Sequence, residues 1–232
     1  MLTDRSSRAI RAGLLAVLVV VPCRAATGQT TPGAGPPVSP AQPRSPCGSA
    51  NGGQPCYTAD DVHFMQGMIA HHAQALAMTA LVRDRTTDAG LRLVAQRIEI
   101  SQQDEIAMMR RWLESHHEDV PILDANHEAQ MPGMDVPGMK MHGMMMPGML
   151  TEEQMTQLAN AKGAEFDRLF LEGMIQHHRG ALVMVSDLFA TKGAGQAPEI
   201  FSFASDIDAD QRAEIKRMQS MLDGASAAVH HP

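Results

Sequence analysis

The sequence predicts an all-α fold, a four-helix bundle made of two repeated helical hairpins. Apolar side chains recur at three- and four-residue steps over two pairs of long segments, the spacing of one helix face. The pattern Phe-x-x-Gly-Met-Ile-x-His-His-x-x-Ala-x-x-Met also occurs twice, over 64–78 and over 170–184. Two such hairpins bury their apolar faces against each other. No segment alternates apolar and polar residues as a strand does, so we expect no β-sheet.

Residues 1–25 are typical of an export signal. A start with three arginines precedes an apolar run over 12–21, which is shorter than the roughly 20 residues that a membrane-spanning helix needs. Cys23-Arg24-Ala25 then supplies a small-x-small cleavage site. The alternative, lipidation of Cys23, fits poorly with the proline before it. We therefore expect a periplasmic or otherwise extracytoplasmic product with no membrane span after cleavage.

Residues 26–56 are expected to form a flexible tether, and the charge of the remaining chain limits its partners. Residues 27–46 are rich in Pro, Gly, Thr and Ser, and such a segment buries too little apolar surface to fold. The formal net charge is −7, of which residues 1–25 contribute four arginines against one aspartate, or +3. Removing them leaves −7 − 3 = −10, which argues against a nucleic-acid partner and suits cations.

Two cysteines, Cys47 and Cys56, lie at the end of this tether, just ahead of the first predicted helix. In an oxidising compartment a disulfide between them is the expected state. The alternative is a pair of soft metal ligands.

The first hairpin is expected over 57–117. Thr58 is a suitable N-cap, and two aspartates in the first turn favour the helix dipole. The apolar steps continue to a turn near residues 85–87. A second amphipathic helix is predicted from about Asp88 to Ser115.

The second hairpin is expected over 151–223. Its long first helix, kinked or divided near Gly163, runs to about Ala190, and its last helix runs from Pro198 to about Leu222. The second helices of the two hairpins also share a pattern, Gln-x-x-Glu-Ile-x-x-Met, at 102–109 and 211–218. Residues 224–232 are expected to form a disordered tail.

Each repeated motif joins thioether sulfur to imidazole nitrogen. Helical spacing places the first His and both Met on one face and turns the second His about 100° away, toward a flank or a neighbouring helix. If these faces point inward, Glu105 and Gln102, or Glu214 and Gln211, could approach the imidazoles from the partner helix. These ligands suit Cu(I) and Ag(I), and Cu(II) is possible. The bland alternative is that the methionines fill the core and the histidines are only hydrogen-bonded. The candidate ligands here are Met68, His71, His72, Met78, Met174, His177, His178 and Met184.

The linker over 118–150 is rich in methionine. It holds eight methionines within 131–149, and Pro-Gly-Met occurs three times there. Proline and glycine at this density preclude a helix or a buried strand, so a core stripe does not explain the sulfurs. Flexible thioethers could wrap a Cu(I) ion; the alternative is a sticky low-complexity loop. The candidate ligands here are Met139, Met141, His142, Met144, Met145 and Met146.

With these residues in view, the chain resembles the family called domain of unknown function 305, which includes CopM-like periplasmic copper-binding proteins. The match rests on 64–78, 166–184 and the two Gln-x-x-Glu-Ile-x-x-Met segments. The resemblance implies a ferritin-like bundle and, for some members, copper binding and copper tolerance outside the cytoplasm. By position it places copper on Met68, His71, His72, Met174, His177 and His178.

We therefore expect an exported copper-binding protein that sequesters or hands on Cu(I) or Cu(II) in metal tolerance or homeostasis. Its partners would be copper or silver ions and an envelope metal-handling protein. The alternative is a metal-free envelope interaction or stress module that docks through the methionine-rich loop. We expect no enzyme, because the Glu-x-x-His pattern of carboxylate di-metal oxidases occurs once, at 114–117, and is not repeated.

Overall fold

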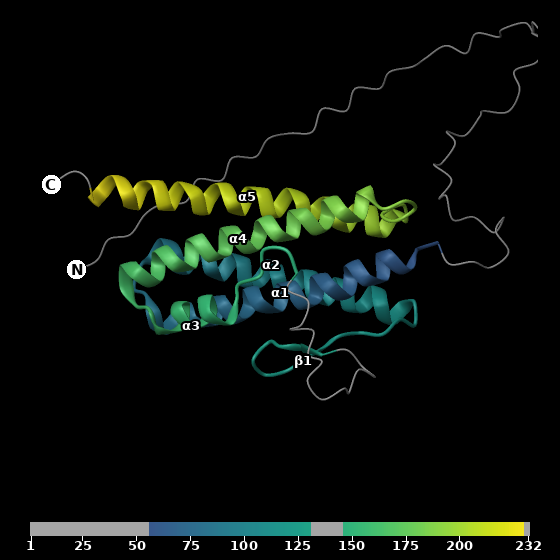
Figure 1. The fold of residues 1–232 in the computed structure, drawn as a ribbon, viewed down its shortest axis with the longest axis horizontal. Helices are drawn as coiled ribbons and strands as arrows, with labels where there is room; N and C mark the ends of the chain where they lie inside the picture. Colours follow the sequence, from purple (N-terminus) through teal and green to yellow (C-terminus); the bar gives the residue numbers. More distant parts are fainter. Residues whose placement is uncertain (1–55, 131–145, 230–232) are drawn as a thin grey trace, which may run out of the picture. The chain divides into compact units, whose positions relative to one another are not determined.

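A computed structural model of the chain describes residues 56–130 and 146–229, and its architecture is helical (Figure 1). Four long helices carry the two hairpins, which confirms the predicted all-α class. Their bounds are α1 Ala59–Arg85, α2 Ala89–Ser115, α4 Gly163–Ala190 and α5 Pro198–Val229. That this bundle is ferritin-like stays a prediction.

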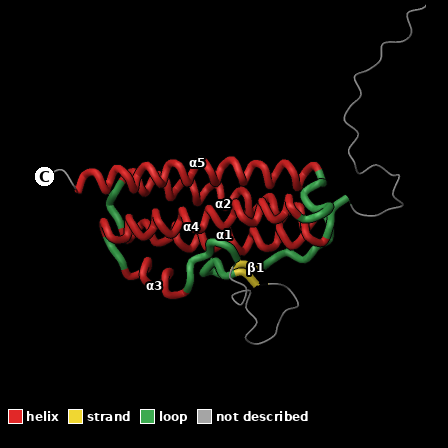
Figure 2. Tube along the Cα trace, turned by 45° about the horizontal axis from the view of Figure 1, so that its top comes forward, coloured by secondary structure: helices red, strands yellow, loops and turns green. Residues whose placement is uncertain are grey.

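The long helices pack as hairpins that meet through α1 and α4. Helix α1 packs along α2, α4 packs along α5, and α1 packs against α4. The short helix α3, Glu152–Asn160, lies against α1 and α4 (Figure 2). Two clusters of buried apolar side chains fill the space between the helices. The repeated motifs, which lie on α1 and α4, are thereby brought face to face.

Local capping explains where the helices begin. The Thr58 hydroxyl accepts from the Asp61 backbone N–H at 3.2 Å, and the Asp61 carboxylate accepts from the Thr58 N–H at 2.8 Å, which forms a capping box. Asp88 caps α2 by accepting from the Leu91 N–H at 2.6 Å. These bounds agree with those predicted, and so does the division of the third helical stretch before Gly163.

Helix α5 extends further than predicted. It runs to Val229, past the end expected near Leu222 and into the segment 224–232 that the sequence predicts as a disordered tail. Gly224 alone does not end the helix, because residues 225–229 are mostly alanine, the strongest helix former.

The expectation of no β-sheet is wrong for one short segment of the linker. Strand β1, Ile122–Leu123, pairs antiparallel with β2, Ala129–Gln130. The Asp124 carboxylate stabilises the turn by accepting from the backbone N–H groups of Asn126 and Glu128 at 2.8 and 2.9 Å. Strands of two residues are too short for an alternation of side chains to show in the sequence.

Several predictions concern residues outside the described part. The expected signal, the tether and Cys47 lie within 1–55, so cleavage and the disulfide stay predictions. Five candidate ligands of the linker lie outside it as well: Met139, Met141, His142, Met144 and Met145. Among the helices that the structure describes, none combines the length and the apolar character that a membrane span requires.

Candidate metal centre

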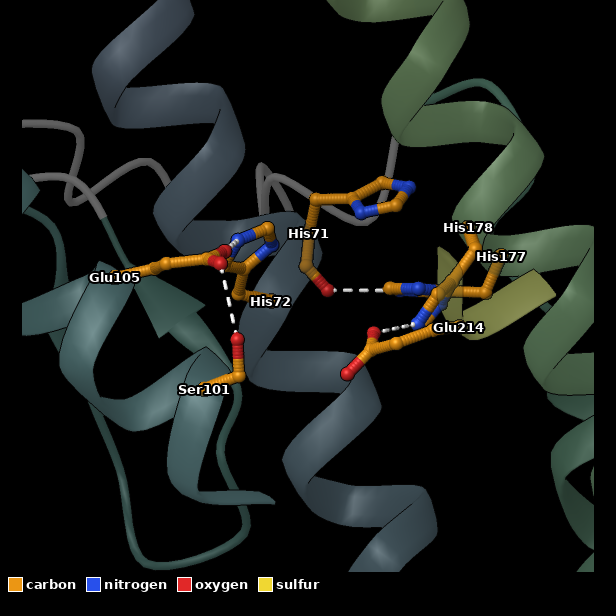
Figure 3. Close-up of polar contacts among 7 residues, drawn as sticks. All are labelled: His71, His72, Ser101, Glu105, His177, His178 and Glu214. Atoms are coloured by element: carbon orange, nitrogen blue, oxygen red, sulfur yellow. Dashed lines mark hydrogen bonds and ion pairs between the residues drawn. The ribbon is translucent and has the colours of Figure 1, made fainter. Parts of the chain in front are cut away.

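The four histidines of the repeated motifs are buried where α1 meets α4 (Figure 3). His71 and His72 come from α1, and His177 and His178 come from α4. The rings of His71 and His177 stack across the interface with centroids 3.8 Å apart and planes inclined by 35°. The ring of His72 lies beside that of His71, with centroids 6.3 Å apart, and the ring of His178 lies beside that of His177, with centroids 6.1 Å apart.

The outer imidazoles bind carboxylates of the second helix of their own hairpin. His72 Nε2 donates to Glu105 of α2 at 2.5 Å, and His178 Nε2 donates to Glu214 of α5 at 2.6 Å. Figure 3 shows these two pairs on opposite sides of the central rings. Ser101 also donates to Glu105, at 3.1 Å. The expectation that Glu105 and Glu214 could approach the imidazoles from the partner helix is confirmed, and the structure shows that the rings they reach are those of His72 and His178.

The central imidazoles bind backbone carbonyls. His71 Nε2 donates to the carbonyl of Pro147 at 3.0 Å, and His177 Nε2 donates to the carbonyl of His71 at 2.9 Å. A carbonyl oxygen can only accept, so the Nε2 atom of each central ring carries the hydrogen. In a neutral ring the other nitrogen, Nδ1, then has an unshared electron pair.

The Nδ1 atoms are the unusual feature of this centre. In all four histidines Nδ1 is buried and has no hydrogen-bond partner within the described part of the chain. Buried polar atoms are nearly always paired, so four such atoms at equivalent places need an explanation. Metal-binding histidines characteristically donate one ring N–H to a carboxylate or a backbone carbonyl and bind the ion with the other nitrogen. Each of the four rings uses Nε2 in this way, with a carboxylate or a backbone carbonyl as the acceptor.

Burial keeps the central rings neutral. The pKa of His71 is lowered from 6.5 to about 3, first by burial and then by the neighbouring His72. Burial, followed by the other three imidazoles, also holds the pKa of His177 well below its usual value. Burial, the largest single influence, raises the pKa of Glu105, but the hydrogen bonds from His72 and Ser101 together with the nearby charge of His72 and His178 outweigh it, so the pKa of this carboxyl is lowered. Neutral imidazole is the form that binds a metal ion.

This burial predicts a pH-dependent stability of the metal-free protein. Between about pH 6.5 and about pH 3 the unfolded chain protonates His71 while the folded chain does not. The contribution of neutral His71 to the free energy of unfolding is therefore fully present above about pH 6.5 and is lost as the pH drops toward about 3. Urea unfolding of wild type and of the H71A/H177A variant at a series of pH values checks this. An equally steep pH dependence in the two proteins would contradict it.

The thioethers of the motifs divide into buried and half-buried groups. Met68, Met78 and Met174 are fully buried within the apolar clusters, as expected for methionines that pack the core. Met184 is half-buried at the edge of one cluster, and Met146 of the linker is also half-buried. Whether any of the five binds metal stays a prediction.

Carboxylates and imidazoles alone do not complete a site in this structure. Across residues 56–130 and 146–229, no three His, Cys, Asp or Glu side chains lie close enough together to hold a metal ion. Gln102 and Gln211, expected beside the imidazoles, are buried, and their side-chain oxygens have no hydrogen-bond partner among the described residues.

Sequence reasoning missed the carbonyl of Pro147 as the partner of His71. One signal could have found it. The second motif has Gly180 where the first has Gln74, and an isolated glycine in a helix indicates a close approach of another backbone. In the structure Pro147 lies directly against Gly180.

Four other described histidines lie away from the centre, and one of them, His63 of α1, is exposed. His116 stacks on Trp112 with ring centroids 4.3 Å apart, and its Nδ1 donates to the Trp112 carbonyl at 2.7 Å. His117 is exposed, and His127 lies in the linker after β1. The role of His116 is thus explained by packing and capping at the end of α2.

Comparisons with known proteins show the family of the chain and agree with its helical fold. The family described as Domain of unknown function (DUF305) matches residues 61–222. A DUF305 fragment from Deinococcus radiodurans is 28% identical, with a TM-score of 0.59 over 73% of this chain and 99% of that one. A putative secreted DUF305 protein from Streptomyces coelicolor is 30% identical, with a TM-score of 0.55 over 71% and 93%. CopM in its Cu(I)-bound form is 27% identical, with a TM-score of 0.51 over 71% and 96%.

A curated relative matches only a short part. An uncharacterized protein of Acanthamoeba polyphaga mimivirus is 40% identical over 55 residues, which are 24% of this chain. The chain spans 36% of the length of that relative.

Proposed function

Because the chain belongs to the DUF305 family, whose fold it shares with CopM, we propose that it binds copper, Cu(I) in preference to Cu(II), at the histidines between α1 and α4. The protein would sequester the ion or hand it on, without catalytic turnover. We place this role outside the cytoplasm, on the signal-like residues 1–25 and on the relative described as secreted.

One observation carries the proposal. Four buried imidazoles each commit Nε2 to an oxygen acceptor and leave Nδ1 without a partner among the described residues. A structural histidine in a core normally satisfies both nitrogens, since an unpaired buried polar atom costs about 1–3 kcal/mol. Four such penalties in one interface are accounted for if an ion binds there.

The chemistry of the surroundings favours Cu(I). Neutral imidazoles and thioethers are the ligands that a soft monovalent ion prefers, and thioethers do not oxidise to disulfides as thiolates do. The two carboxylates that contact the rings, Glu105 and Glu214, are already hydrogen-bonded to His72 and His178. CopM, with 27% identity, has been solved with Cu(I). Its structure with Cu(II) is 26% identical with a TM-score of 0.50, so Cu(II) is the second ion to test.

Titration with Cu(I) under reducing conditions tests the proposal. The mature chain, residues 26–232, would compete with a Cu(I) chelator of known affinity in the absence of oxygen. We expect at least one Cu(I) per chain with an affinity tighter than micromolar. Less than one ion per chain at micromolar Cu(I) would overturn the proposal and favour a metal-free docking role for the linker.

A further inference from the structure

The segment 146–150 forms a strap that crosses from α1 to α4. At α1, the side-chain amide of Gln74 donates to the carbonyl of Leu150 at 3.0 Å and its oxygen accepts from the Leu150 N–H at 2.8 Å. At α4, Gln176 donates to the carbonyls of Gly148 and Met149, both at 3.4 Å. Residues 148–150 of the strap are therefore held by side chains of both helices that carry the histidines.

The strap also contacts the centre itself. The carbonyl of Pro147 accepts the hydrogen bond from His71 at 3.0 Å. It lies so close to α4 that a β-carbon on Gly180 would be 1.8 Å from that oxygen. The position of the strap thus determines which nitrogen of His71 carries the hydrogen.

The strap brings one thioether beside another. A β-carbon placed on Gly67 would lie 3.5 Å from the sulfur of Met146 and 3.5 Å from the terminal methyl of Met184. Two thioether groups, one from the linker and one from α4, therefore meet over the same point of α1. Met146, Met184 and Gly67 are all half-buried, whereas His71 is fully buried.

The equivalent place in the other half lacks the second sulfur. Over Gly173, which matches Gly67 in the repeat, lie the methyl of Met78 at 3.4 Å and a methyl of Leu150 at 3.0 Å. The repeat alone would make the two places alike. The strap makes them different, because it supplies methionine on one side and leucine on the other.

Met146, one of the two thioethers over Gly67, also lines an open cavity. A cavity of about 650 Å³ lies beside the strap and is lined by Met146, Met149 and Ala70, among others. Ala70 directly precedes His71 on α1, and Gly67 lies one helical turn before His71. A ligand over Gly67 is therefore close both to the outside and to the buried imidazole.

We propose that Met146 and Met184 form a two-thioether site for a soft monovalent ion over Gly67, from which the ion passes to His71. This inference rests on the proposed function and adds an entry site to it. The transfer is a ligand exchange in which Nδ1 of His71 replaces a sulfur. The ion keeps its charge, and no electron or proton needs to move.

The site is tested with Ag(I) and with protein whose methionine methyl groups are labelled with ¹³C. At less than one Ag(I) per chain, we expect the methyl resonances of Met146 and Met184 to shift together and that of Met149 to stay in place. Met149 is the matched control, because it lies on the same strap beside the same cavity. The inference would be overturned if the Met149 resonance shifted while those of Met146 and Met184 stayed in place. It would also be overturned if neither the Met146 nor the Met184 resonance shifted.

Variants then test the role of the site in uptake. In M146L and in M184L the rate of Cu(I) uptake should fall by at least about tenfold. Replacing even a residue that only hydrogen-bonds to a metal ligand lowers metal affinity or activity by about 10- to 100-fold. M149L should load like wild type. G67A is a further variant, because a β-carbon there makes only ordinary contacts and yet fills the space between the thioethers. It should slow uptake without lowering the melting temperature.

The outcomes separate this inference from the proposed function. If wild type binds Cu(I) and M146L, M184L and G67A load as fast as M149L, the entry site is refuted and the histidine centre stands. If wild type binds no Cu(I), both are refuted.

Discussion

Replacing His71 and His177 together by alanine is expected to weaken Cu(I) binding by more than about 100-fold. Replacing a residue that only hydrogen-bonds to a metal ligand already lowers metal affinity by about 10- to 100-fold. The two rings stack at 3.8 Å and are buried, so no nearby solvent-exposed group can take their place in this interface. The measurement is the chelator competition described above, made on the variant at equal protein concentration.

The matched control is the double variant H63A/H117A. Both side chains are exposed, and His63 lies on α1 like His71. It should bind Cu(I) as wild type does. Circular dichroism of the H71A/H177A variant shows whether its helices are intact. An intact variant with unchanged Cu(I) stoichiometry and affinity would show that the central imidazoles are not ligands.

Gly180→Ala is expected to destabilise the protein by about 1–3 kcal/mol, the range observed for overpacked cores. The added β-carbon would lie 1.8 Å from the Pro147 oxygen, so either α4 or the strap must move. Movement of the strap breaks the hydrogen bond from His71 Nε2 to Pro147, so that neither ring nitrogen of His71 keeps a hydrogen-bond partner among the described residues. Urea unfolding of the metal-free protein measures the change in stability.

Gly224→Ala is the control for this prediction. Gly224 lies in α5, and a β-carbon there would meet nothing within 4 Å in the described structure. The substitution should stabilise the protein by about 0.5–1 kcal/mol, because alanine favours a helix over glycine. If Gly180→Ala also stabilised the protein, the strap would not be fixed against α4 as described.

The helices could be predicted closely because their signals are local. Thr58 and Asp88 begin α1 and α2 where capping predicts, and Gly163 begins α4 after a break. Capping and face patterns of this kind depend on residues three to seven positions apart, which a single sequence displays directly. The partner of His72 differs in this respect, because Glu105 lies 33 positions away and the sequence indicated only that it could approach one of the imidazoles.

The strap could not be predicted, because it depends on contacts across the chain. Pro147 reaches His71 from 76 positions away, and no local pattern fixes that approach. The Pro-Gly-Met pattern excludes a helix but says nothing of where the loop lies. The glycine at 180 marks a close approach without naming the segment that approaches.

The methionines illustrate the same limit. Helical spacing placed Met68, Met78 and Met174 on inward faces, and all three are buried as packing requires. Spacing cannot tell a packed thioether from one that binds metal. The distinction proposed here comes from exposure and convergence, since Met146 and Met184 are half-buried and meet over one point.

The central claim is that the free Nδ1 atoms of the histidines bind the ion, and imidazole ¹⁵N NMR during the Cu(I) titration tests it most directly. In the metal-free protein His71 and His177 should show the form with hydrogen on Nε2, as their carbonyl partners require. On addition of Cu(I), the Nδ1 resonances of both rings should shift while Nε2 keeps its hydrogen. Nδ1 resonances that stay in place while the protein binds Cu(I) would contradict the account.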